Sequence, residues 1–310
     1  MRIAVYIPLL LSLLAPLGAR PLAERCEPRL ATWLLTASAL LLGTATTISL
    51  GLLTITGLIR FPQLAGLGHW SAHTAQRDDP AELSVALIAG LLLGAAVLMA
   101  ARMLWRRART LATAALEAAC MPAEDGLVVI EDEAPNAFAI PGLPGRVVVS
   151  TGMLHTLDET ERHILLAHER AHLTSRHYAF VALAQLGAAA NPLLRPLATA
   201  VTYTIERWAD ESAAAATGDR EGVARTVGKA ALAAHHASGR TPGAALAILG
   251  RRTPLAAAGP VPRRVAALLA PPFGRHPVLA AVTATVLAVT VLSTAEAAHD
   301  LHLLLEAVGA

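Results

Sequence analysis

The feature that most constrains this chain is a set of four long apolar segments that carry almost no charge. They cover residues 3–19, 30–59, 83–102 and 276–298. A helix that crosses a bilayer needs about 20 mostly apolar residues, because hydrocarbon cannot hydrogen-bond an open backbone. The sequence therefore predicts a multipass α-helical membrane protein with four transmembrane helices.

The composition supports this class and excludes others. Apolar residues make up 55% of the 310 residues and charged residues 15%, whereas soluble chains have roughly 25% charged residues. Only two cysteines are present, Cys26 and Cys120, which excludes a disulfide-built scaffold. The net charge of +2 offers no strongly basic surface, so we expect membrane lipid as a partner and no direct contact with nucleic acid.

Arginines gather beside three of the predicted spans. The positive-inside rule places such clusters in the cytoplasm, and with four spans all three fall on that side. The clusters are Arg20, Arg25 and Arg29; Arg102, Arg106, Arg107 and Arg109; and Arg263, Arg264 and Arg275. The predicted organisation is a three-helix membrane region at 1–105, a cytoplasmic domain at 106–275, the fourth span, and a short extracellular tail at 299–310. The 60–82 loop then also lies outside.

The first apolar segment has a second interpretation. Arg2, the apolar run and the small residues at 16–19 also fit a signal peptide with its cleavage site. Cleavage would leave the arginines at 20–29 outside the cell, against the positive-inside rule. The charge pattern therefore favours four retained spans over three.

Residues 106–275 have ordinary polar content and are numerous enough for one folded domain. Strands are expected first, and the second and third would form a hairpin around the Pro-Gly-Leu-Pro-Gly turn at 141–145. Four helices follow, and the first should open with a capping box at 156–159. The expected strands are 127–131, 136–140 and 146–150; the helices begin near Thr156, His177, Pro196 and Glu221, and a linker at 254–262 precedes a short helix at 263–270.

The first of these helices carries a pattern with chemical meaning. His168 and His172 are four residues apart, so both imidazoles project from one helix face and can reach one metal ion. Glu169 follows the first histidine and can act as general base, taking a proton from the hydrolytic water and passing it to the leaving amine. The pattern predicts one Zn²⁺ ion per chain.

A catalytic zinc site usually has three protein ligands, so a third is needed. The best candidate is Glu206, on the third helix. Asp210 lies one turn further along the same face and can accept a hydrogen bond from the free ring N–H of a ligating histidine. Both acidic residues also fit a solvated helix face, but the two upstream histidines favour the metal site. The helix beginning near His177 must then run back across the domain.

This arrangement resembles the gluzincin-type membrane zinc peptidases, which comprise the HtpX/Ste24 and BlaR/MecR groups. The resemblance implies a mostly helical α+β zincin-like domain in a bacterial cell membrane, and a zinc metalloendopeptidase that hydrolyses peptide bonds on the cytoplasmic side. Residues 136–139 followed by 148–154 resemble the hairpin that offers an edge strand to an extended substrate. The resemblance makes Asn136, Ala137, Phe138 and Ala139 candidates for contact with the substrate.

The order of segments separates the two groups. Three spans, a zinc domain and a fourth span resemble the BlaR/MecR arrangement, whereas HtpX/Ste24 proteins place further hydrophobic segments after the zinc helix. The chain stops at Ala310, without the C-terminal sensor domain of BlaR/MecR proteins. The implied function is regulatory proteolysis of a protein or peptide, such as a transcriptional repressor or the chain itself. An HtpX-like quality-control protease and a catalytically silent zinc-binding receptor or scaffold are the alternatives.

Other histidines carry weaker signals. His163 and His177 flank the motif without sharing the ligand face, so both are expected to be polar surface or rim groups. His177 or Tyr178 is a weak candidate for stabilising the tetrahedral oxyanion. A transporter is disfavoured because the second and third spans contain no internal charge.

Overall fold

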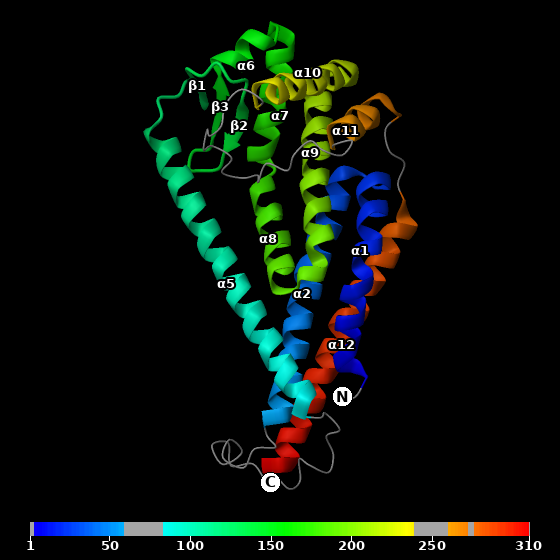
Figure 1. The fold of residues 1–310 in the computed structure, drawn as a ribbon. Helices are drawn as coiled ribbons and strands as arrows, with labels where there is room; N and C mark the ends of the chain where they lie inside the picture. Colours follow the sequence, from blue (N-terminus) through cyan, green and yellow to red (C-terminus); the bar gives the residue numbers. More distant parts are fainter. Residues whose placement is uncertain (1–2, 59–82, 239–259, 272–275, 310) are drawn as a thin grey trace.

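The structure is a computed structural model that describes residues 3–58, 83–238, 260–271 and 276–309. A bundle of long helices forms one end of the molecule, and a small sheet with shorter helices forms the other (Figure 1). Within the described residues, four helices are long and apolar enough to cross a membrane, as the sequence predicts. They are α1 (Ile7–Arg25, after the 3-10 turn η1, Ala4–Tyr6), α2 (Pro28–Leu58), α5 (Leu83–Cys120) and α12 (Pro277–Gly309).

Three of these helices extend past the predicted spans. Helix α1 continues to Arg25, and α5 runs without a break through residue 106, the predicted domain boundary. Helix α12 reaches Gly309, so most of the predicted tail at 299–310 is helical. The extensions are rich in alanine, leucine and arginine, which favour helix whether or not lipid surrounds them. The predicted 60–82 loop and Arg275 lie outside the described residues.

A three-stranded sheet supports one side of the domain. Its strands are β1 (Leu127–Ile130), β2 (Ala137–Ile140) and β3 (Arg146–Ser150), in the order β1-β3-β2. The predicted hairpin is confirmed, because β2 pairs antiparallel with β3; β1 pairs parallel with β3. Strand β2 is therefore an edge of the described sheet, and its outer edge is available for pairing.

The helices after the sheet are α6 (Thr151–Thr156), α7 (Glu159–Thr174), α8 (His177–Ala190), α9 (Arg195–Thr217), α10 (Arg220–Ser238) and α11 (Pro260–Leu269), with a 3-10 turn η3 (Pro192–Leu194) between α8 and α9. The predicted cap of the first helix is wrong, because Thr156 ends the unpredicted helix α6. The capping box joins Asp158 and Glu161, with both bonds at 2.9 Å. In the expected linker at 254–262, residues 260–262 begin α11, and the rest lies outside the described residues.

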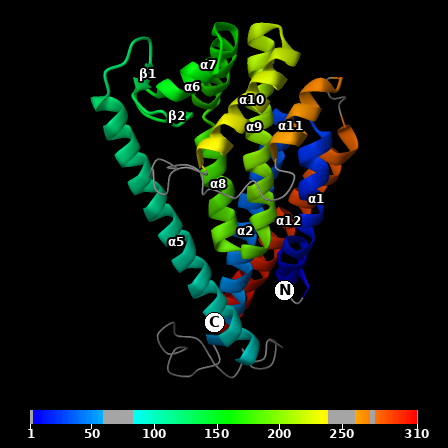
Figure 2. The same cartoon turned by 45° about the horizontal axis from the view of Figure 1, so that its top comes forward.

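Helices α8 and α9 form a hairpin that runs down between the spans (Figures 1 and 2). Gly187 of α8 packs so closely on α2 that a Cβ there would lie 2.0 Å from the carbonyl oxygen of Ala39. At the tip, Asn191 Nδ2 donates a hydrogen bond to Thr46 Oγ1 at 3.2 Å. A buried apolar cluster joins α1, α2, α8 and α9, and its most buried members are Ala31, Leu35, Ala39, Ala184 and Val201. Part of the predicted domain at 106–275 thus lies alongside the predicted membrane region.

We expect Gly187→Ala to lower the stability of the chain by about 1–3 kcal/mol, because the added methyl group must push α8 away from α2. Gly51→Ala is the matched control, since a Cβ there meets nothing within 4 Å and alanine favours helix. Thermal unfolding in detergent, followed by size-exclusion chromatography, measures both. Equal melting temperatures for the two variants would contradict the close packing.

Candidate metal centre

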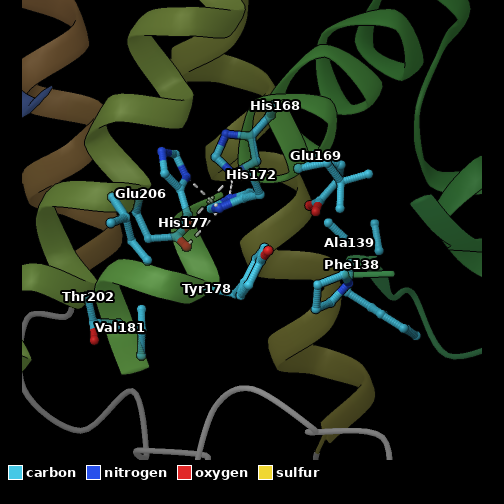
Figure 3. A pocket seen from close by; sticks show the side chains of 14 residues that line it. Phe138, Ala139, His168, Glu169, His172, His177, Tyr178, Val181, Thr202 and Glu206 are labelled. Carbon is cyan, nitrogen blue, oxygen red and sulfur yellow. Dashed lines mark hydrogen bonds and ion pairs between the residues drawn. The ribbon is translucent and has the colours of Figure 1, made fainter. Parts of the chain in front are cut away.

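Three potential metal ligands converge from two helices. Helix α7 supplies His168 and His172 one turn apart, and the neighbouring helix α9 supplies Glu206. The ligand atoms of these three residues all lie within 4.8 Å of one another. Figure 3 shows the three side chains pointing toward a common centre, with Glu169 and Tyr178 also in the pocket.

The separations of these atoms fit a tetrahedral ion. His168 Nε2 lies 3.2 Å from His172 Nε2, and the two nitrogens lie 3.6 Å from Glu206 Oε2 and Oε1 respectively. Ligands held at about 2.0–2.1 Å from a tetrahedral zinc ion are about 3.3 Å apart. Two imidazoles and a carboxylate are also a donor set that zinc prefers. The residues present therefore fit a zinc ion.

Asp210 and Arg264 lie behind the predicted ligands. Asp210 is almost fully buried, and its Oδ1 lies 3.1 Å from His168 Nδ1. Arg264 of α11 donates to both oxygens of Asp210, at 2.8 and 2.6 Å, and its Nη1 lies 3.0 Å from Glu206 Oε2. One guanidinium thus contacts the carboxylates of both Glu206 and Asp210 and fixes the side on which each meets His168.

The ligand candidates together with Asp210 and Arg264 form a charged cluster, and the charges within it shift the pKa values of its members. Burial disfavours charge on His168, but Asp210 and Glu206 outweigh it and raise its pKa to about 10. Burial acts against charge on the two carboxylates as well. Arg264 and His168 nevertheless hold the pKa of Glu206 and of Asp210 below their usual range. The metal-free cluster is therefore a set of ion pairs in which His168 carries a proton.

The prediction that His177 is a surface or rim group is wrong. Its side chain is 1% exposed, and its Nδ1 lies 2.9 Å from Nδ1 of His172. Helix α7 ends at Thr174 and a new helix begins at His177, as the sequence predicts, but Arg176 between them has a φ of 52°. This turn folds His177 back against the ligand, where its ring packs 4.7 Å from that of Trp208. Burial and the neighbouring His172 lower the pKa of His177 to about 3.

The cluster lies at the junction of two cavities of about 340 and 190 Å³. Ala137, His168, Glu169 and Glu206 line both, so the cavities meet at the ligands. The larger cavity is also lined by Phe138, Ala139, His177 and Tyr178. Three of the four substrate-strand candidates thus face the site. Asn136 does not line either cavity, and its amide instead donates to the carbonyl oxygen of Ala134 at 3.3 Å.

Sequence reasoning missed the role of Arg264, which it placed only in a basic cluster at the membrane surface. The residue lies inside the short amphipathic helix α11, four positions before the buried Leu268 and hence on the same face. A charge on the apolar face of a helix requires a buried partner. This spacing indicates that Arg264 points inward, although it does not identify Asp210 as the partner.

Comparison with known proteins agrees with this geometry. Residues 106–191 match the model of Peptidase family M48. That segment contains His168, Glu169 and His172, whereas Glu206 and Asp210 lie beyond it. A protease HtpX homolog from Pelodictyon phaeoclathratiforme is 39% identical over 89 residues.

The match to that homolog covers 27% of this chain and 31% of the relative, so the chain spans less than a third of the relative's length. No solved structure matches the chain. The comparisons therefore show that part of the chain is similar to peptidases of family M48, in a protein with four helices that are long and apolar enough to cross a membrane among the described residues.

We expect Arg264→Gln to destabilise the fold by roughly 3–5 kcal/mol, because it removes the guanidinium that donates to both oxygens of the buried Asp210 carboxylate. The adjacent Arg263→Gln is the matched control and should cost less than about 1 kcal/mol, since the side chain of Arg263 is 46% exposed. Chemical or thermal unfolding of the metal-free chain measures both. Similar losses for the two variants would contradict the role given to Arg264.

Zinc binding should release a proton from His168. The pKa of His168 in the fold, about 10, lies above its ordinary value of 6.5, so the metal-free protein holds this proton at neutral pH. Zinc affinity should then rise about tenfold per pH unit between pH 7 and 9, because the metal must displace the proton. Calorimetry in two buffers of different ionisation enthalpy counts the protons. Asp210→Asn should release fewer than the wild type, and equal numbers would refute the assignment.

Proposed function

We propose that the chain is a membrane-bound zinc metalloendopeptidase that hydrolyses peptide bonds next to the membrane. The observation that carries this proposal is the set of ligand atoms from His168, His172 and Glu206, whose spacing fits one tetrahedral zinc ion. Glu169 lines the same cavities, where a hydrolytic base is needed. A site that bound zinc only for structure would have no use for this base.

The residues have separate tasks in peptide hydrolysis. A zinc ion held by the three ligands would supply Lewis-acid activation of a water molecule and of the scissile carbonyl. Glu169 takes the proton of the water and delivers it to the nitrogen of the leaving amine. Asp210 holds His168 by its Nδ1, so that Nε2 faces the centre. His177 faces Nδ1 of His172 in the same way.

The shape of the site favours cleavage within a chain. An endopeptidase must hold substrate on both sides of the scissile bond, and the ligands lie where two cavities meet. Strand β2 is an edge strand, and Ala137, Phe138 and Ala139 line the larger cavity. An extended peptide can pair with this edge through backbone hydrogen bonds. We infer that the substrate is bound as an added strand.

The hairpin of α8 and α9 bears on the choice between the two groups of zinc peptidases. Helix α8 is a short apolar helix directly after the zinc helix, and it packs on α2. A hydrophobic segment at this place resembles the HtpX arrangement, as does the match to an HtpX homolog. We therefore favour an HtpX-like protease that cleaves membrane proteins. Regulatory cleavage of a repressor or of the chain itself, as in BlaR/MecR proteins, is the second hypothesis.

The arginines near the ends of the predicted spans indicate on which side of the membrane the metal centre lies. Arg20 lies near the C-terminal end of α1 and Arg29 at the start of α2. These ends of the two helices, and the C-terminal half of α5 that carries the arginines at 106–109, point toward the part of the molecule that holds the sheet (Figure 1). We propose that this end faces the cytoplasm, because arginines near span ends favour that side. Protease protection of tagged termini in sealed vesicles tests the orientation, and a metal centre outside the cell would refute it.

Glu169→Gln should abolish proteolysis and leave zinc bound. General acid–base groups contribute about 10²–10⁴-fold, so we expect at least a hundredfold loss of casein cleavage or self-cleavage. Glu159→Gln is the matched control, since it lies exposed in the first turn of the same helix. Zinc content is measured in parallel by atomic emission. Full activity of the Glu169 variant would refute the base, and zinc without any activity in the wild type would favour a silent receptor.

The substrate can be found with the same variant. Membranes from cells with wild-type chain and with Glu169→Gln are compared by mass spectrometry of new peptide ends. Many cleaved membrane proteins would support the HtpX-like proposal. A single cleaved repressor, or cleavage of the chain alone, would support regulatory proteolysis instead.

A further inference from the structure

A cationic cleft of about 420 Å³ lies between α1 and α9, separate from the metal centre. Three arginines and two hydroxyl groups line it: Arg20 from α1, Arg263 from α11, and Arg195, Thr199 and Tyr203 from α9. The guanidinium of Arg263 lies over the ring of Tyr203, 4.6 Å from its centroid. None of these residues belongs to the proposed catalytic site, so the cleft requires its own explanation.

The charges in this cleft are not balanced. One carboxylate, Glu24, lines it and is already shared, since its Oε1 lies 2.9 Å from Arg20 Nε and 3.1 Å from Arg263 Nη1. Among the residues that the structure describes, no carboxylate lies within ion-pair distance of Arg195, which is exposed. The cleft therefore has an excess of positive charge and space for an anion.

Arg195 lies at the tip of the hairpin of α8 and α9, next to a helix that is long and apolar enough to cross a membrane. It directly follows η3, and the preceding Asn191 contacts Thr46 in the middle of α2. An arginine that lies among membrane spans extends its side chain toward the interface, where lipid phosphates lie. Arg20, near the end of α1, faces the same cleft. With these helices in a bilayer, we therefore expect the guanidinium groups of the cleft to reach the lipid headgroups.

An apolar cavity of about 240 Å³ adjoins the cleft, and Ala19 lines both. It lies between α1, α2, α9 and α12 and is lined mainly by aliphatic side chains such as Leu14, Leu22, Leu42 and Val282. A phosphate group joined to an acyl chain can fill both spaces, whereas inorganic phosphate can use only the first. The pair of cavities thus matches a phospholipid.

We propose that this cleft binds the headgroup phosphate of an anionic phospholipid, with Arg195 as its principal partner and an acyl chain in the adjoining apolar cavity. An anionic lipid is favoured over a zwitterionic one because three guanidinium groups face a single carboxylate. Helix α11 would then contact lipid through Arg263 and the metal centre through Arg264. The bound lipid would hold α11 in its place.

Native mass spectrometry of the full chain in detergent with added phosphatidylglycerol tests this site. We expect Arg195→Gln to reduce the fraction of chain that carries the lipid about fivefold, the effect of one arginine near an anionic surface. Arg106→Gln is the matched control, because Arg106 is exposed on α5 and does not line the cleft. It should bind as much lipid as the wild type. An unchanged elution volume in size-exclusion chromatography shows that the variants are folded.

Three results would overturn the proposal. Equal lipid loss in the two variants would mean that the arginines attract anionic lipid without a site. Equal retention of phosphatidylcholine and phosphatidylglycerol would exclude charge recognition. Displacement of the lipid by millimolar inorganic phosphate would assign the cleft to the free anion. None of these measurements uses proteolysis, so they stand whether or not the proposed function holds.

Discussion

The candidate metal centre depends on two carboxylates that lie one turn apart on α9 and point into the protein. Glu206 meets the two histidines of α7, and Asp210 lies behind His168. A buried charge without a partner costs several kcal/mol, so α9 can pack here only where His168 and Arg264 supply opposite charge. This requirement fixes the rotation of α9 about its axis and therefore the direction of Glu206.

Packing against α2 fixes the position of α8 and α9 along the bundle. Lipid tails are as apolar as leucine, so helices in a membrane associate through close contact of small residues and a few hydrogen bonds. The close contact here is that of Gly187 with Ala39, and the hydrogen bond is the one that Asn191 donates to Thr46. An interhelical hydrogen bond in a membrane contributes only about 0.6 kcal/mol, so the backbone contact is the stronger determinant.

Local patterns in the sequence predicted most of what the structure contains. The apolar segments and the pair His168 and His172 could be predicted because each depends on positions that are close together in one helix. The pairing of β2 with β3 could be predicted because a short turn joins the two strands. Glu206 could be predicted only by assuming that α8 runs back, which the described helices do. Arg264 could not be assigned, because its bond to Asp210 spans 54 residues and nothing in the sequence marks the pair.

Two errors had local causes. The capping-box pattern occurs twice in overlapping positions, beginning at Thr156 and at Asp158, and only the structure shows that a short helix ends at the first. His177 was misplaced because the sequence does not show that the left-handed backbone of Arg176 turns the start of α8 back toward His172. Both errors arose where one helix ends and another begins within three residues, because periodicity does not specify the backbone turn between the two helices.

In the proposed protease, the hairpin of α8 and α9 also sets the distance between the site of hydrolysis and the lipid. Helix α8 has 14 residues, so about 20 Å separate the ligand end of the hairpin from its tip among the spans. An anchored substrate must bridge the part of this rise that lies outside the bilayer before it can reach β2. Since an extended chain covers about 3.3 Å per residue, a tether of several unfolded residues is needed. Proteins folded tightly against the membrane surface would be spared.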